Sequence, residues 1–182
     1  MMLWLQPLAA WGIASLLMMV VWRIQRRIGD AGIVDVAWTY AVGAFGVTFA
    51  VLGEGDPWRR AAIATVAAIW SLRLGTHVLL RVLKHPEDGR YVSLKQGWGA
   101  DAQRQLAIFY QYQAFGAVLF SVPMLLAAQS RLPLGAHDLI ALVIAAVSWI
   151  GEAWADRQLA RFRDDPANKG QVCRRGWWRY SR

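Results

Sequence analysis

Five long apolar blocks constrain the fold of this chain more than any other feature of its sequence. Each is close to the roughly 20 residues that a helix needs to cross the hydrocarbon core of a membrane. Charged residues make up only 18% of the chain, below the about 25% that is usual in soluble domains. The sequence therefore predicts an all-α protein, a single polytopic transmembrane helix bundle. The predicted spans are residues 3–22, 31–53, 61–83, 105–128 and 136–156, followed by a polar segment over 157–182.

The Lys and Arg residues gather in alternate loops. Three lie between the first two blocks, five between the third and fourth, and eight after the fifth, so that sixteen of the 20 share one side. The loops on the other side hold only Arg59, Arg60 and Arg131. By the positive-inside rule, the N-terminus is predicted to face out and segment 157–182 to be cytoplasmic. This alternation explains the net charge of +8 better than nucleic-acid binding does, and the basic loops are expected to attract anionic lipid headgroups.

Motifs for common cofactors and metals do not occur in the sequence. No glycine-rich fingerprint follows a strand, so a bound dinucleotide cannot be held by a Rossmann unit. Cys173 is the only cysteine, which excludes an internal disulfide, and no His/Cys spacing indicates a metal site. Functional residues must therefore be sought among the polar side chains within and beside the spans.

Arg73 is the first of these polar residues. The apolar stretch before it, residues 61–72, rises only about 18 Å as a helix, short of a core about 30 Å thick. Arg73 is therefore expected at membrane depth, where ionisable groups usually mark function. Trp70, His77 and Arg81 share its helical face. Snorkelling of the charged heads to the interface is the alternative, and it suits Arg81 better than Arg73. Beyond the span, the Pro-Glu-Asp-Gly run at residues 86–89 predicts a solvated turn.

Asp35 lies one turn inside the cytoplasmic end of the second span. Thr39, Gly43 and Gly46 continue its helical face and are small enough for close helix approach or for a pocket. Two interpretations stay open. Either Asp35 serves chemistry, or it pairs with an Arg such as Arg73 and fixes the packing of the helices.

The fifth span carries two acids and an arginine on one face, Glu152, Asp156 and Arg163. Two carboxylates one turn apart repel each other, so the pair makes sense where cations or hydrogen-bond donors meet it. The Asp-Asp-Pro run at residues 164–166 is predicted to end this helix. The Arg-rich segment 168–182 suits phosphate groups, because the guanidinium fork matches phosphate oxygens. An interfacial anchor that uses its aromatic residues is the alternative.

Several stretches of the chain together resemble one family. In order and at fitting separations, from about residue 30 to the end, the chain contains "DVAW", "WSLRLGTHVLLR", "EDGRY", "GEAWADRQLARFR" and "NKGQVCRRGWWRYSR". These stretches resemble the bacterial DUF1295 group of the steroid 5-alpha-reductase family. The resemblance implies an all-helical reductase of the bacterial inner membrane that binds NADPH at its cytoplasmic side and reduces an activated carbon–carbon double bond. In that family "RYSR" is followed by His-Pro-Asn-Tyr and further membrane helices, so this chain is expected to stop short of both.

The resemblance also implies which residues bind the cofactor. In and after the third span, positions that line the cofactor cavity and the loop that closes over it are matched by Arg73, His77, Arg90 and Tyr91. On the fifth helix, the polar face that meets the nucleotide is matched by Glu152, Asp156 and Arg163. In or beside the signature segment lie Asn168, Arg179, Tyr180 and Arg182.

Two departures from the family bear on catalysis. Steroid reductases of the family place a Tyr three residues before the position of Arg73, where this chain has Trp70. The indole N–H of Trp70 donates a hydrogen bond but cannot replace the hydroxyl as an acceptor. The partner Glu of that Tyr is matched by the shorter Asp35. Asp35, held protonated in an apolar site, and Trp70 are the predicted catalytic donors to the substrate carbonyl, on which charge develops. The substrate is expected to be a steroid-like, isoprenoid or other lipid enone.

Two other functions stay open. Isoprenylcysteine carboxyl methyltransferases share a similar C-terminal signature and bind S-adenosylmethionine in a comparable helical cavity. The Arg residues favour a cofactor with several phosphates, which S-adenosylmethionine lacks. In the remaining interpretation, the chain is a non-catalytic lipid-binding membrane protein whose buried charges only pair with each other.

Overall fold

The computed structural model describes residues 3–180, and all regular structure in that range is helical. This confirms the predicted all-α class. The α-helices are α1 (Leu5–Ile28), α2 (Ile33–Leu52), α3 (Pro57–Lys84), α4 (Gly89–Trp98), α5 (Ala102–Ala128) and α6 (Ala136–Asp164). Short 3-10 helices are η1 (Gly99–Asp101), η2 (Pro166–Asn168) and η3 (Gly176–Arg179). Five helical segments of the described range are long and apolar enough to cross a membrane, as the apolar blocks predicted.

Two of the helices run past the apolar blocks into charged sequence. α1 continues to Ile28, and Gly29 then takes a left-handed φ of 80° while its N–H donates to the Gln25 carbonyl. This is the usual way to satisfy the last carbonyls of a helix. α6 continues to Asp164, and Asp165 with Pro166 ends it as predicted. The hydropathy pattern does not predict these last turns of α1 and α6, because their side chains are polar although the backbone is still helical.

α4 was not predicted, since residues 86–89 indicated only a turn. The helix begins there because Asp88 caps it: its Oδ1 accepts the backbone N–H of Arg90 at 2.9 Å. α4 ends at Gly99, whose φ of 52° favours glycine. The turn that the sequence indicated is therefore the start of a short polar helix.

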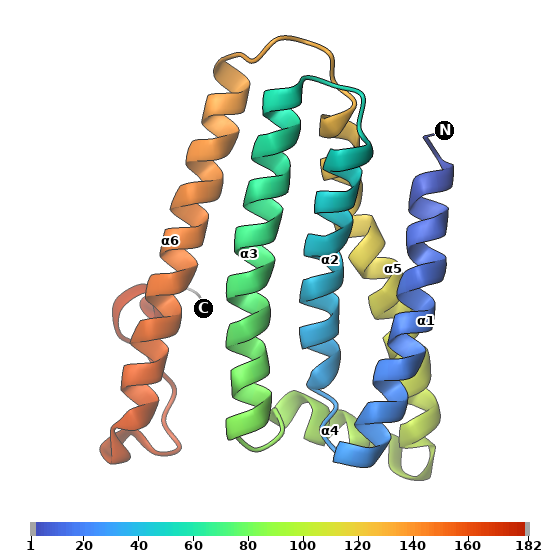
Figure 1. Ribbon diagram of the computed structural model, residues 1–182. Coiled ribbons are helices and arrows are strands. Elements are labelled where there is room, and N and C mark those ends of the chain that lie inside the picture. Colours follow the sequence, from blue (N-terminus) through green and yellow to red (C-terminus); the bar gives the residue numbers. More distant parts are fainter. Residues whose placement is uncertain (1–2, 181–182) are drawn as a thin grey trace. The chain divides into compact units, whose positions relative to one another are not determined.

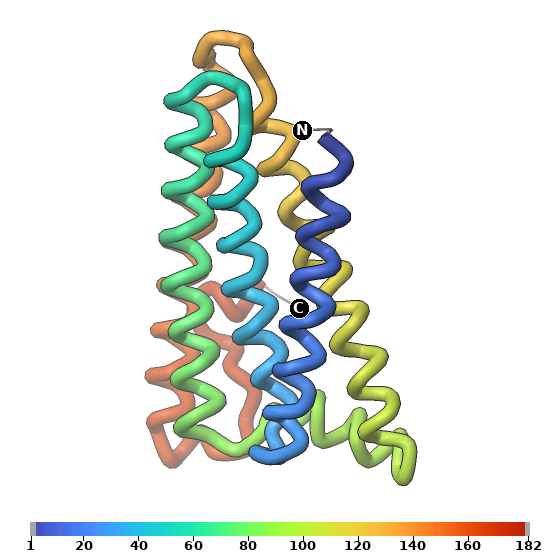
Figure 2. Tube along the Cα trace, turned by 45° about the vertical axis from the view of Figure 1, so that its right-hand side comes forward, coloured from blue at the N-terminus to red at the C-terminus, as the bar shows by residue number. Residues whose placement is uncertain are grey.

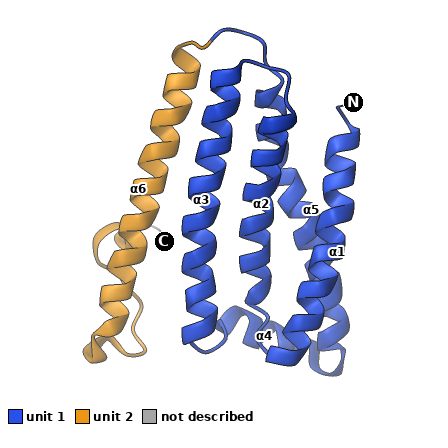
Figure 3. Cartoon of the chain, in the orientation of Figure 1, with its two compact units in different colours: residues 1–133 blue, residues 134–182 orange. Residues whose placement is uncertain are grey.

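The chain divides into two compact units, residues 1–133 and residues 134–182, which are described separately (Figure 3). In the first unit, α1, α2, α3 and α5 form a bundle of long helices, and α4 lies across one end of it (Figures 1 and 2). The prediction of one transmembrane domain over the whole chain stays a prediction.

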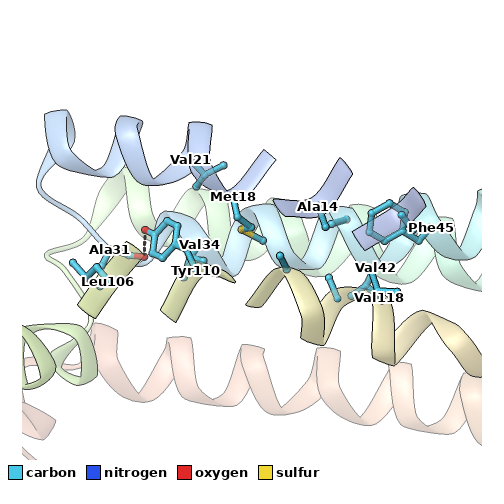
Figure 4. Close-up of a cluster of buried hydrophobic side chains, with 14 of the residues drawn as sticks. Ala14, Met18, Val21, Ala31, Val34, Val42, Phe45, Leu106, Tyr110 and Val118 are labelled. Carbon is cyan, nitrogen blue, oxygen red and sulfur yellow. Dashed lines mark hydrogen bonds between the residues drawn. The ribbon is translucent and has the colours of Figure 1, made fainter. Parts of the chain in front are cut away.

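The core of the first unit is built largely from small residues. α1 contributes Ala14 and Met18, and α5 contributes Leu106, Tyr110 and neighbouring alanines, all fully enclosed (Figure 4). Small side chains let helix backbones approach closely, which is how membrane helices gain packing contacts without a hydrophobic driving force. The Tyr110 hydroxyl donates to the Ala31 carbonyl at 3.1 Å, so the one polar atom of this large side chain is satisfied (Figure 4).

A seam of close contacts joins α2 to α3 and α5. A Cβ at Gly43 would collide with the Ser71 side chain, and one at Gly46 would collide with Met124. A Cβ at Gly75 would lie 2.7 Å from the Tyr40 ring. The predicted role of Gly43 and Gly46 in close helix approach is therefore confirmed.

Polar contacts fix the end of the first unit that holds loops 53–56 and 129–133. The Gly55 N–H donates to the Ala128 carbonyl and the Asp56 N–H to the Ser130 carbonyl, each at 2.9 Å. Arg59, only 6% exposed, donates to the carbonyls of residues 130 and 132. Arg60 donates to the carbonyls of residues 50 and 51, at the C-terminus of α2. Arg59, which the sequence showed only as a loop charge, thus satisfies carbonyls of loop 129–133. Arg60 satisfies carbonyls in the last turn of α2 that have no partner in their own helix.

Most of the basic side chains of the first unit lie at its other end. Arg26 and Arg27 lie in the last turn of α1, Arg81 and Lys84 in the last turn of α3, and Lys95 on α4. Figure 1 shows these segments at the end opposite to loops 53–56 and 129–133. The alternation of charged loops is therefore present in the fold, and the cytoplasmic location of the basic end stays a prediction.

Candidate functional site

An acid with three side-chain partners at the basic end is Asp35, in the first turn of α2. Its Oδ1 accepts a hydrogen bond from the Tyr91 hydroxyl at 2.7 Å. Tyr91 lies on α4 and is only 3% exposed, and its ring packs edge-on against Phe109. α4 therefore brings a buried phenol hydroxyl to an acid in the first turn of another helix.

Two arginines join this acid to a second one. Arg90 Nη2 lies 3.4 Å and Arg81 Nη2 3.9 Å from Asp35 Oδ2. The same arginines hold Asp88, with Arg81 Nη1 2.9 Å and Arg90 Nη2 3.2 Å from its Oδ2. We refer to Asp35, Arg81, Asp88 and Arg90 as the charge cluster. Its two acids and two arginines alternate, so each charge faces an opposite one.

The electrostatics of the charge cluster are clearest at Asp88. Burial raises the pKa of its carboxyl, but hydrogen bonds from Arg90 and the charges of Arg90 and Arg81 outweigh this effect and lower it to about 2. Asp88 is therefore a carboxylate at every physiological pH, and it keeps both arginines close to the start of α4.

A second set of contacts attaches the region around α4 to the turn between α1 and α2. Glu87 Oε1 accepts the Ala31 N–H at 2.7 Å. Lys95 pairs with Glu87 and also donates to the Gly29 carbonyl at 2.9 Å. Because residues 29–32 lead directly into α2, these bonds determine where Asp35 stands relative to α4.

The surroundings of Asp35 differ from those the sequence suggested. One of the two open interpretations was pairing with an Arg such as Arg73, and the arginines that approach Asp35 within the described range are Arg81 and Arg90. Its site is polar, with a hydroxyl and two guanidinium groups, so the apolar site assumed for a protonated donor is not present. In this geometry Asp35 accepts a hydrogen bond from the Tyr91 hydroxyl. The catalytic role of Asp35 stays a prediction.

The other predicted residues of the third span lie on one uninterrupted helix, α3. Trp70 is partly buried against the core of the first unit, Arg73 is half-buried, and His77 is exposed. Arg81 follows on the same helix, where it joins the charge cluster. The last residue of this helical face, Arg81, therefore lies in the same group of polar contacts as Asp35, Arg90 and Tyr91.

In the second unit, α6 carries the remaining predicted residues of the fifth span. Glu152 and Asp156 are half-buried, and Arg163 is exposed. The segment after α6 folds back along it: the Trp178 Nε1–H donates to the Ala155 carbonyl and the Trp177 N–H to Gln158 Oε1, each at 2.9 Å. This return places the Arg-rich signature segment beside the polar half of α6.

The predicted residues of the signature segment have separate environments. The Asn168 side-chain amide donates to the Phe162 carbonyl at 2.9 Å, which ties η2 to the end of α6. The Arg179 guanidinium lies 5.9 Å from the centre of the Tyr180 ring, and Tyr180 is 81% exposed. Arg182 lies outside the described residues. Cys173, by contrast, is only 6% exposed.

Sequence reasoning missed three residues of this site: Asp88, Glu87 and Lys95. A signal existed for Asp88, because an Asp immediately before a short polar run is a common helix cap. Glu87 and Lys95 gave no such signal, since their partners are backbone atoms of the distant segment 29–31.

The model of one protein family, described as a protein family of unknown function (DUF1295), matches residues 21–182. This agrees with the DUF1295 resemblance drawn from the sequence motifs. No curated protein and no solved structure matches the chain. The kinship with steroid 5-alpha-reductases and the position of the chain's end relative to that family stay predictions.

Proposed function

We propose that this chain, which belongs to the DUF1295 family, is a membrane-embedded NADPH-dependent reductase of an activated carbon–carbon double bond. The observation that carries the proposal is the meeting of Asp35, Tyr91 and two arginines at the basic end of the first unit. A proton-bearing hydroxyl and a set of phosphate-binding side chains are the two things that such a reductase needs from its protein. The substrate would be an apolar enone, steroid-like, isoprenoid or another lipid, that arrives from the membrane.

The donor set fits a nucleotide with several phosphates. Arg90 and Arg81 have side chains that are 67% and 31% exposed, so their guanidinium groups are within reach of a dissolved anion. Arg163 is exposed on α6, and its planar fork suits phosphate oxygens. In this assignment Arg90 and Tyr91 of the first unit hold the nucleotide. Arg163, Asn168 and Arg179 of the second unit stay nucleotide-binding residues predicted from the family resemblance.

The reaction adds two hydrogens across the double bond. When bound, NADPH would be the source of the hydride that the β-carbon receives, and would be oxidised to NADP⁺. The chain's residues hold the remaining proton at Tyr91 Oη, with Asp35 Oδ1 as its acceptor in the resting arrangement. Trp70, the donor predicted from the sequence, lies eleven residues before Arg81 on α3, about 16 Å along the helix. At the level of Asp35, the proposed donor to the carbonyl oxygen, where negative charge develops, is therefore Arg81. The α-carbon takes the proton from Tyr91 Oη, a proton from water restores the hydroxyl, and the saturated carbonyl compound is released to the membrane.

The location of this chemistry follows from the charge pattern. The basic end of the first unit would face the cytoplasm, where NADPH is available, and would attract anionic lipid headgroups. The apolar substrate would come from the surrounding lipid. Both partners could then meet at the level of Asp35, one turn inside its helix.

The test is direct binding and turnover by the full-length protein in nanodiscs. Calorimetry should show that NADPH binds more tightly than NADH, because the additional 2′-phosphate meets Arg side chains. Arg163→Glu should weaken NADPH binding by about 2–4 kcal/mol, since a charge-assisted contact becomes a repulsion. Incubation with NADPH and a lipid extract should yield a product heavier by two hydrogens in mass spectrometry.

Two results would replace the proposal. Binding of S-adenosylmethionine without binding of NADPH would establish the methyltransferase alternative. Binding of lipid alone, with no effect of any of these cofactors, would make the charge cluster a structural element of a non-catalytic lipid-binding protein.

A further inference from the structure

Arg90 differs from the other members of the charge cluster in its exposure. Its guanidinium contacts Asp88 at 3.2 Å and Asp35 at 3.4 Å, yet its side chain is 67% exposed. The side chains of Arg81, Asp35 and Asp88 are 31%, 26% and 19% exposed. Arg90 therefore forms the water-facing edge of the cluster, and it is the member that a dissolved anion reaches first.

Both carboxylates keep a donor when the Arg90 side chain turns away. Asp88 retains Arg81 Nη1 at 2.9 Å, and Asp35 retains the Tyr91 hydroxyl at 2.7 Å. Breaking an ion pair is costly mainly when it leaves an unpaired buried charge, and this departure leaves none. The backbone does not need to move, because the Arg90 N–H stays bonded to Asp88 Oδ1 as the first hydrogen bond of α4.

We infer that Arg90 exchanges between these carboxylates and a phosphate group of the nucleotide, and that Asp88 sets nucleotide affinity by competing for Arg90. This inference rests on the proposed function. Carboxylate and phosphate both match the guanidinium fork, so each can replace the other on Arg90. Asp88 is thus a positioning residue: it does not touch the nucleotide but determines how readily Arg90 does.

The experiment replaces Asp88 by Asn in the full-length protein in nanodiscs. Asp88→Asn keeps a side-chain oxygen for the helix cap but removes the charge that competes for Arg90. The Kd for NADPH, measured by calorimetry at constant ionic strength, should fall about two- to fivefold, the scale of one partly exposed ion pair. Glu54→Gln is the matched control. It makes the same charge change at the opposite end of the unit, where Glu54 pairs with Arg131 at 2.8 Å, and should leave the Kd unchanged.

The same substitution in an Arg90→Gln protein distinguishes competition for Arg90 from a general effect of charge or fold. In the Arg90→Gln protein, the gain from Asp88→Asn should vanish, because the residue that is competed for is gone. A gain that persists in that background overturns the inference. So does an Asp88→Asn Kd equal to or higher than that of the wild type while NADPH still binds, and the proposed function then stands. A wild-type protein that does not bind NADPH overturns both.

Discussion

Removal of one oxygen atom, by Tyr91→Phe, tests whether the hydroxyl bond to Asp35 holds α4 in place. The ring is 3% exposed and its contacts with Phe109 are kept by Phe, so the change isolates the 2.7 Å hydrogen bond. A hydrogen bond to a charged group contributes about 1.5–3 kcal/mol. Asp35 is 26% exposed and keeps the two arginines, so part of this is recovered, and we expect a loss of about 1–2 kcal/mol in the free energy of unfolding.

The assay is equilibrium unfolding in mixed detergent micelles, followed by circular dichroism. Hydrogen exchange of the α4 amides gives a local readout, and it should accelerate in Tyr91→Phe. Tyr112→Phe is the matched control, because Tyr112 lies on α5 and is 71% exposed; its change should stay within about 0.5 kcal/mol. Equal losses from the two variants, or unchanged exchange in α4, would show that the bond does not hold this helix.

Three further outcomes are expected. Asp35→Asn should preserve expression, and NADPH should bind at least as tightly because Asp35 also competes for Arg90. Turnover should fall roughly ten- to a thousandfold, the scale of one lost acid–base or oxyanion group; unchanged turnover removes Asp35 from the mechanism. Because the pKa of Asp88 is depressed to about 2 from 3.8, its contribution to stability is complete above 3.8 and is lost as the pH falls through 2. Hydrogen exchange of α4 should therefore accelerate in that window, and the step should be absent in Asp88→Asn. For topology, a membrane-impermeant thiol reagent on intact cells should label Glu54→Cys but not Ser93→Cys, both in a Cys173→Ser background; the reverse pattern inverts the orientation. The native Cys173 is too enclosed to serve as this probe.

The parts of the fold that could be predicted are those set by local sequence. An apolar block long enough to cross a membrane defines a helix on its own, and the spacing of Arg73, His77 and Arg81 defines one face of it. The relative position of two helices is a different matter. Arg73 was the example given for an arginine that could pair with Asp35, but the partners are Arg81 and Arg90. Periodicity predicts the face of a helix and not the depth at which another helix meets it.

The same reasoning explains why the contacts of α4 were missed. Its ten residues are too polar for a span, and its position depends on bonds to backbone atoms of residues 29–31. A hydrogen bond to a backbone atom does not depend on the residue type of the partner, so the sequence pattern cannot predict it. The motif "EDGRY" indicated the correct segment by family resemblance, but only the fold shows that its Asp and Arg belong to one cluster with Asp35.

The seam between α2 and α3 limits how this protein can open. The Ser71 side chain packs against Gly43, and the Tyr40 ring packs against Gly75. The hydroxyls of Tyr40 and Thr76 share a hydrogen bond of 3.1 Å. These close contacts oppose sliding of α2 along α3, and we expect the two helices to move together. A lipid substrate that enters laterally from the bilayer is therefore expected to pass between other helices and not between α2 and α3.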